Sequence, residues 1–238
     1  MVFCIISLGE GQMESGNMEV PKRGSGDYAH IIVKAGLSAI PIVGGPAAEL
    51  FNVIIVPPLE RRREEWLRSI AEGLAGLERR INGYTIESLS GNEMFVTAIV
   101  HASRAALGSH QREKLEALRN AILNIAGGRW TDEDLHLLFL ELVDSLTPWH
   151  LRILRFWQDP ISASEIYARL PGAPTMRGIL EEKIPELRGR QAVYEPIVRD
   201  LVSRGLIVFQ TGWEGTSIEI NKTTEFGDLF LKFIESPL

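Results

Sequence analysis

The sequence predicts a mainly α-helical protein with two parts: an N-terminal helical bundle that contains an apolar helical hairpin, and a C-terminal winged helix with a small two-stranded wing. Two observations lead to this prediction. Apolar residues recur at helical spacing over much of the chain after residue 59. Residues 148–234 then predict, in order, three helices, two alternating strands and a closing helix, which is the order of a winged helix. We therefore expect a tail at 1–28, a bundle at 29–146 and a winged-helix domain at 147–238.

The first 28 residues are polar and Gly-rich after a short apolar start, which favours a disordered tail. The start, MVFCIISL, has no positive residue before its apolar run and no small-residue cleavage site after it, so it does not indicate export. The chain has one cysteine, Cys4, which excludes an intrachain disulfide and a multi-cysteine zinc site. These features predict a cytoplasmic protein.

Residues 31–59 form the most apolar stretch and hold two charged residues, Lys34 and Glu49. Proline and glycine interrupt the stretch in its middle, so two short helices, at about 30–40 and 46–56, fit it better than one long helix. One interpretation is a buried hairpin at the centre of the bundle. The other is a hairpin that inserts into a membrane, where small residues let helices approach closely. The residues that would define such a membrane hairpin are Gly36, Pro41, Gly44, Gly45, Pro46 and Glu49.

Four amphipathic helices are predicted next, at about 59–81, 92–107, 109–125 and 131–146. The first begins with an arginine triplet at 61–63, which invites a role in lipid headgroup or phosphate contact. A solvated helix face is the simpler interpretation, because Arg61 and Glu65 stand four residues apart. The acidic run at 132–134 marks the start of the last helix, with Thr131 as its predicted cap.

In the predicted winged helix, residues 191–204 take the position of the helix that contacts DNA bases in proteins of this fold. Arginine and glutamine side chains there have the donors that guanine and adenine edges require. Against DNA binding, Glu195 and Asp200 lie on the same helix, Pro196 interrupts it, and the predicted wing tip at 211–216 has no lysine or arginine. The candidate nucleic-acid contacts are Arg188, Arg190, Gln191, Tyr194 and Arg199.

No catalytic or metal-binding motif accompanies these elements. The five histidines show no metal-ligand spacing, and the glycine turns lack the lysine and hydroxyl residue of a phosphate loop. Two of the histidines, His101 and His110, lie beside apolar helices, where a hydrogen-bonded structural histidine is expected. The net charge of −6 does not suit a surface devoted to nucleic acid. We predict a non-enzymatic protein without a cofactor.

Three segments resemble the bacterial abortive-infection alpha (Abi-alpha) group, whose members are linked to phage defence. They are the helix SLTPWHLRILRFW, the phrase RGLIVF and the ending TTEFGDLFLKFI, together with the hydropathy of the apolar hairpin. The resemblance covers about the last 110 residues, implies a defence context, and transfers no catalytic residue.

These observations predict a bacterial effector or partner-binding protein that has a protein partner or associates with itself, and whose hairpin at 31–59 holds latent membrane activity. The alternative is a winged-helix transcription regulator that binds DNA, with the helical part as a dimer or sensor domain. A scaffold that recruits another protein through the acidic bundle is the third interpretation.

Overall fold

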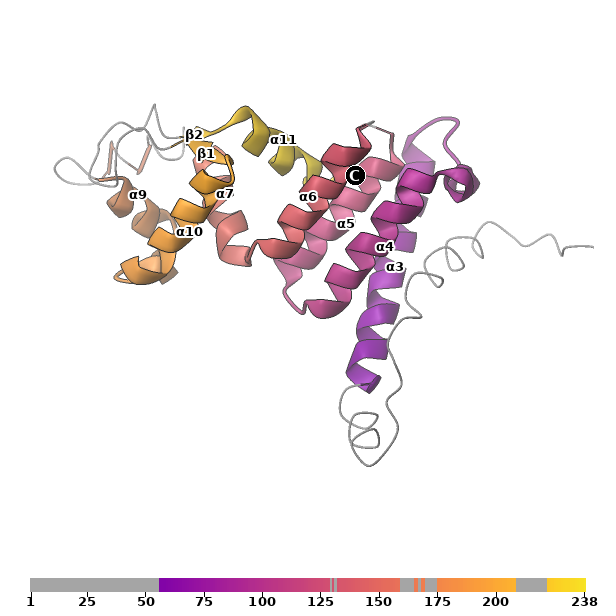
Figure 1. Cartoon of the computed structure of the whole chain (residues 1–238), viewed down its shortest axis with the longest axis horizontal. Coiled ribbons are helices and arrows are strands. Elements are labelled where there is room, and N and C mark those ends of the chain that lie inside the picture. The colour runs from indigo at the N-terminus through magenta and orange to yellow at the C-terminus, as the bar shows by residue number, and fades with distance from the viewer. Residues whose placement is uncertain are drawn as a thin grey trace, which may run out of the picture.

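The computed structural model describes residues 56–128, 130, 132–158, 165–166, 168–169, 175–208 and 222–238. This part of the chain is mainly helical, as the sequence predicts, and one short pair of antiparallel strands is the sheet within it. Figure 1 shows two groups of helices side by side, with the last helix lying across the junction between them.

The helices of the first group are α3 (Val56–Arg80), α4 (Glu93–Gly108), α5 (Arg112–Ala126) and α6 (Glu133–Ser145), with a 3-10 turn, η1 (Ile86–Gly91), between α3 and α4. The second group comprises α7 (Pro148–Gln158), α9 (Met176–Lys183), the turn η2 (Pro185–Leu187), α10 (Gln191–Ser203), and the strands β1 (Ile207–Val208) and β2 (Lys222–Thr223). The closing helix is α11 (Glu225–Phe233).

Helix α5 lies at the centre of the first group and packs against α3, α4 and α6. Its contact with α3 is close because Gly73 has no side chain: a Cβ placed there would lie 2.6 Å from Cδ1 of Leu123. A buried hydrogen bond from Trp66 Nε1 to Ser103 Oγ, 2.9 Å long, also joins α3 to α4. The apolar face predicted for the first amphipathic helix is confirmed here, since Trp66, Ile70, Leu74 and Leu77 are all buried.

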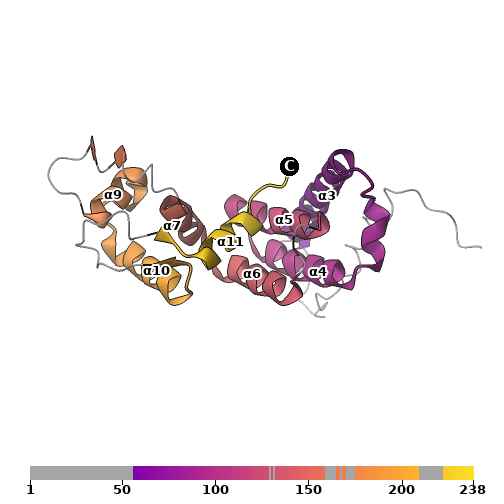
Figure 2. The same cartoon turned by 90° about the horizontal axis from the view of Figure 1, so that it is seen from above.

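The second group packs on the first through α7 and α11. Figure 2 shows α11 running from beside α7 and α10 toward α5, and the chain ends next to the first group. The last residue reaches α3, where a Cβ on Gly76 would lie 3.1 Å from Cδ2 of Leu238. Residues far apart in the sequence are thereby brought into one body.

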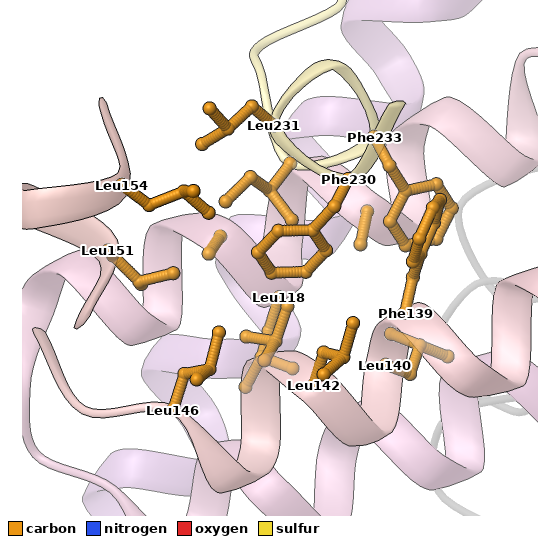
Figure 3. Packing of buried hydrophobic residues seen from close by; sticks show 14 of the residues in the cluster. Leu118, Phe139, Leu140, Leu142, Leu146, Leu151, Leu154, Phe230, Leu231 and Phe233 are labelled. Carbon is orange, nitrogen blue, oxygen red and sulfur yellow. The ribbon is translucent and has the colours of Figure 1, made fainter. Parts of the chain in front are cut away.

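The hydrophobic core is continuous across both groups. Phe230 of α11 is fully buried, and in Figure 3 its ring lies between leucines of α7 on one side and Phe139 of α6 on the other. The rings of Phe139 and Phe230 meet edge to face with centroids 5.5 Å apart. Aromatic pairs of this geometry add about 0.5–1.5 kcal/mol each to the stabilisation from burial. The labelled members of the cluster are Leu118, Phe139, Leu140, Leu142, Leu146, Leu151, Leu154, Phe230, Leu231 and Phe233.

Most helix positions agree with the sequence prediction, and the differences are local. Helix α5 begins at Arg112, three residues after its predicted start. The cap of α6 is Asp132, whose side chain accepts from the Leu135 N–H at 3.0 Å, in place of the predicted Thr131. Helix α9 was not predicted. The second predicted strand, at 217–221, lies outside the described residues, and so do the helices predicted at 30–40 and 46–56, apart from Val56, which begins α3.

Candidate functional site

Helix α10 occupies the predicted position and carries one face into the core. Tyr194, a candidate base contact, is fully buried on that face. Its hydroxyl donates to Oε1 of Glu181 on α9 at 2.6 Å. Burial and this carboxylate both raise the pKa of the Tyr194 hydroxyl. Tyr194 therefore holds α9 to α10 and does not reach the surface.

Two further candidates are bound by glutamates of the same chain. Arg188, at the entry to α10, forms an ion pair with Glu182 and donates from Nε to the Glu181 carbonyl oxygen at 3.3 Å. Gln191 donates from Nε2 to the carboxylate of Glu195 one turn along the helix. Contact with a base edge would require each side chain to break these bonds first.

The remaining candidates, Arg190 and Arg199, are exposed. Within the described part of the chain neither side chain forms an ion pair. Arg199 lies on the face of α10 opposite Tyr194, among small and apolar residues. We call this the outer face of α10, and its residues are Ala192, Val193, Pro196, Arg199, Val202 and Ser203.

The carboxylates of α10 are neutralised by neighbouring cations. Glu195 lies 3.5 Å from Nη2 of Arg177 on α9. Asp200 Oδ2 lies 2.8 Å from Nε of Arg204 and 3.3 Å from Nε2 of His150 on α7. The pKa of His150 is lowered, chiefly by burial, although Asp200 acts in the opposite direction. The outer face therefore has little net charge apart from its arginine.

The residues of the predicted membrane hairpin all lie outside the described residues. None of the helices that the structure describes is both long and apolar enough to cross a membrane. The hairpin residues are Gly36, Pro41, Gly44, Gly45, Pro46 and Glu49.

A groove of about 550 Å³ lies between the first half of α3 and the turn that joins α4 to α5. Its apolar lining comes from Trp66, Ala106 and Leu115. Four arginines and two glutamates also line it, so that positive charge exceeds negative charge by two. We call it the arginine groove, and its charged residues are Arg61, Arg62, Glu65, Arg112, Glu116 and Arg119.

The chain matches no protein-family model, no curated protein and no solved structure. Its function must therefore be argued from its own residues. In the part of the chain with a described structure, no three histidine, cysteine, aspartate or glutamate side chains come together as a metal site.

A second cavity, of about 540 Å³, adjoins the arginine groove and shares Ser109 and His110 with it. Its lysine, Lys114, is bound to the carbonyl oxygen of Asp144 and lies 3.4 Å from the Asp144 carboxylate. Nδ1 of His101, which also lines this cavity, is buried and has no hydrogen-bond partner among the described residues, contrary to the expected structural bond. Lys114 is thus already matched by an acid, whereas Arg104, which also lines this cavity, is exposed and forms no ion pair among the described residues.

The arginine groove was not predicted from the sequence, where the triplet at 61–63 was interpreted as a solvated helix face in preference to a lipid headgroup or phosphate contact. Arg112 and Arg119 stand seven residues apart and so share a face of α5, and the triplet at 61–63 begins α3. The sequence contains both signals, but it does not show that α3 and α5 pack side by side. The predicted Arg61–Glu65 pair does not form, although the structure describes both residues, and Arg63 instead lies 3.7 Å from Glu60.

Proposed function

We propose that this chain is a non-enzymatic bacterial effector of the phage-defence type that acts by binding a protein partner. Its C-terminal part, residues 147–238, is a winged-helix domain used for docking. The observation that carries the proposal is the state of α10, where three of five candidate base contacts are held by glutamates of the same chain.

The order of elements supports the winged-helix assignment. Strand β1 follows α10 after a turn at Gly205, whose φ is +70°, and pairs in antiparallel fashion with β2. Helix α11 then begins directly after β2, with Thr224 as its cap. A helix, a strand pair and a closing helix in this order form the second half of a winged helix.

The outer face of α10 indicates the chemistry of the partner. Val193 and Val202 are each 38% exposed and are two of the four exposed large apolar residues in the described structure. Two arginines, Arg190 and Arg199, have no anion partner among the described residues. A protein surface with an apolar centre and at least one carboxylate would complement this face.

Binding to duplex DNA tests the proposal against its alternative, a DNA-binding regulator. We expect no binding that weakens with added salt, and no effect of Arg190→Ala or Arg199→Ala on any residual affinity. Salt-dependent binding that either substitution reduces would instead establish the regulator. Arg190 and Arg199 are the observation that favours this second function, since one precedes α10, the other lies on it, and neither has an ion pair in the described structure.

The proposal has a second part, that residues 31–59 form a hairpin with latent membrane activity. Support comes from its position, because the arginine groove begins two residues after this apolar stretch. Fractionation of cells that express the intact chain, and a chain with 31–55 replaced by a polar linker, tests it. Membrane association that resists high salt and is lost on replacement would support the hairpin. A soluble intact chain that unfolds on replacement would show that the segment is core.

A further inference from the structure

We infer that the arginine groove is a binding site for the phosphate group of an anionic ligand. The groove joins three segments: residues 61–69 in the first half of α3, the end of α4 with the turn after it, and the first two turns of α5. In Figure 1 the N-terminal end of α3 projects beyond the ends of α4 and α5, so the groove lies on the side of the body to which the apolar stretch attaches.

The strongest evidence is the state of two guanidinium groups. Arg62 and Arg119 are both partly buried, and neither forms an ion pair with any residue that the structure describes. Arg119 donates from Nε to the carbonyl oxygen of Ser69 at 3.0 Å, which fixes its side chain and leaves the other guanidinium donors available. A partly buried arginine without an ion pair keeps its stem against the protein and has guanidinium donors free to bind an anion.

The acids of the groove do not satisfy these cations. Glu116 is bound by Arg112, with Oε1 2.8 Å from Nε. Glu65 is exposed and has no ion pair within the described structure, so it opposes an anion from the rim. Four arginines against two glutamates still leave an excess of positive charge in a chain whose net charge is −6. The adjoining cavity has a smaller excess, because it is lined by Arg104 and Lys114 against Asp144, and Asp144 pairs with Lys114.

The shape of arginine donors favours phosphate over other anions. A guanidinium presents parallel N–H groups that bind two oxygens of a phosphate at once. The start of α5 adds to this, because Gln111 supplies no side-chain cap and the helix end carries partial positive charge. The apolar lining from Trp66, Ala106 and Leu115 suits a phosphate attached to an apolar group. A phospholipid headgroup and a soluble phosphate compound share this chemistry.

This inference does not depend on membrane insertion of residues 31–59, and one set of experiments separates the two. Binding of the full-length chain is measured to vesicles of phosphatidylcholine, with and without phosphatidylglycerol, and to pyrophosphate by calorimetry. Two groove variants are compared, Arg62→Gln with Arg119→Gln, and Arg61→Gln with Arg62→Gln. The second pair keeps the hydrogen bond from Arg119 to Ser69, so a loss of binding in that variant does not come from a loss of this bond. Thermal unfolding checks that each variant is folded. Arg79→Gln with Arg80→Gln, at the exposed far end of α3, removes the same charge as a control.

We expect binding to pyrophosphate, or to anionic but not neutral vesicles, that falls at least about tenfold in both groove variants and is unchanged in the control. Pyrophosphate binding without vesicle binding would establish a soluble ligand, and would leave the membrane part of the proposed function without support. The inference is overturned if neither probe binds, or if groove and control variants lose equal affinity. If the chain binds neutral and anionic vesicles equally and the groove substitutions do not change this binding, the groove is not a phosphate site. The proposed membrane activity of the hairpin would then still stand.

Discussion

Asn124 of α5 holds the end of α11: its Nδ2 lies 2.9 Å from the carbonyl oxygen of Phe233 and 2.8 Å from that of Glu235. Carbonyl groups at the end of a helix have no partner within the helix, so an external donor satisfies them. One turn earlier, Asn120 donates to the Ile234 carbonyl oxygen at 3.1 Å. Two asparagines of the first group thus cap the last helix of the second, and α11 is fixed across the junction.

Asn124→Asp tests this cap. Aspartate has almost the same shape, but it has no donor and places a negative charge against two carbonyl oxygens. We expect the free energy of unfolding to fall by about 3 kcal/mol, because buried acceptors lose their partner and the charge opposes the helix dipole. Denaturant unfolding measures this. Asn82→Asp, at an exposed position, is the control and should change stability by less than about 0.5 kcal/mol. A loss at position 124 no larger than this would contradict the cap.

Gly227→Ala tests the start of α11. Thr224 and Thr175 cap their helices in the same way, each accepting from the N–H of a glycine three residues later. A Cβ on Gly227 would lie 2.1 Å from the backbone oxygen of Leu206, whereas one on Gly178 meets nothing closer than 3.8 Å. We expect Gly227→Ala to lower the unfolding free energy by about 3 kcal/mol or more, since backbone must move.

Gly178→Ala is the matched control for that substitution. Alanine favours helix over glycine, so stability should stay equal or rise by up to about 1 kcal/mol. Similar losses for both substitutions would show that the glycine requirement belongs to the cap itself and not to the approach of Leu206.

Tyr194→Phe tests whether α10 is held to α9 by the bond to Glu181. Removing the hydroxyl deprives a carboxylate of a donor, so we expect a loss of about 1.5 kcal/mol in unfolding free energy. Tyr84→Phe is the comparison, because the Tyr84 hydroxyl is buried without a hydrogen-bond partner in the described structure, and burial together with Glu78 raises its pKa to about 12. That substitution should be neutral or stabilising. A larger loss of stability in Tyr84→Phe than in Tyr194→Phe would contradict the claim that the bond to Glu181 holds α10 to α9.

The stability of the protein should fall as the pH decreases below about 7. His136 is 1% exposed, stacks on Phe233 with centroids 5.8 Å apart, and has two ring nitrogens without partners among the described residues. Burial lowers the pKa of His136 below its ordinary value of 6.5, as it does for His150. The unfolded chain then binds more protons than the folded chain once the pH approaches 6.5, so the unfolding free energy declines from there down to the lowered pKa values.

His136→Leu removes one of these two groups. We expect a flatter dependence of the unfolding free energy on pH between 7 and 5, and higher stability than the parent at the acidic end. His110→Leu, at an exposed position, should leave the slope as it is. An unchanged slope in His136→Leu would show that this histidine is not held neutral by burial.

Helical periodicity was sufficient to predict most of the described helices, because each buried face repeats along its own segment. Helix α10 and the buried face of α3 were predicted in this way. Helix α9 was not predicted, since its eight residues give too short a pattern for periodicity. Its absence from the prediction mattered, because Glu181 and Glu182 on α9 hold Tyr194 and Arg188.

Features that depend on contact between two segments far apart in the chain could not be predicted from the sequence. Gly227 follows a threonine cap that the sequence shows, but its close approach to the backbone of Leu206 is seen only in the folded chain. The arginine groove likewise needs α3 beside α5. The hairpin at 31–59 stays a prediction, because all but its last residues lie outside the described structure.

The measurement that tests the central claim most directly is site-specific photocrosslinking on the outer face of α10. A benzophenone amino acid replaces Val193 or Val202 in the full-length chain, and Glu72, exposed on α3, serves as the control position. In the native host we expect both α10 positions to give the same discrete protein adduct. Arg199→Glu should reduce the amount of this adduct, and the α3 position should not give it. Adducts to nucleic acid, or none that depend on Arg199, would contradict the claim that this chain acts by binding a protein through α10.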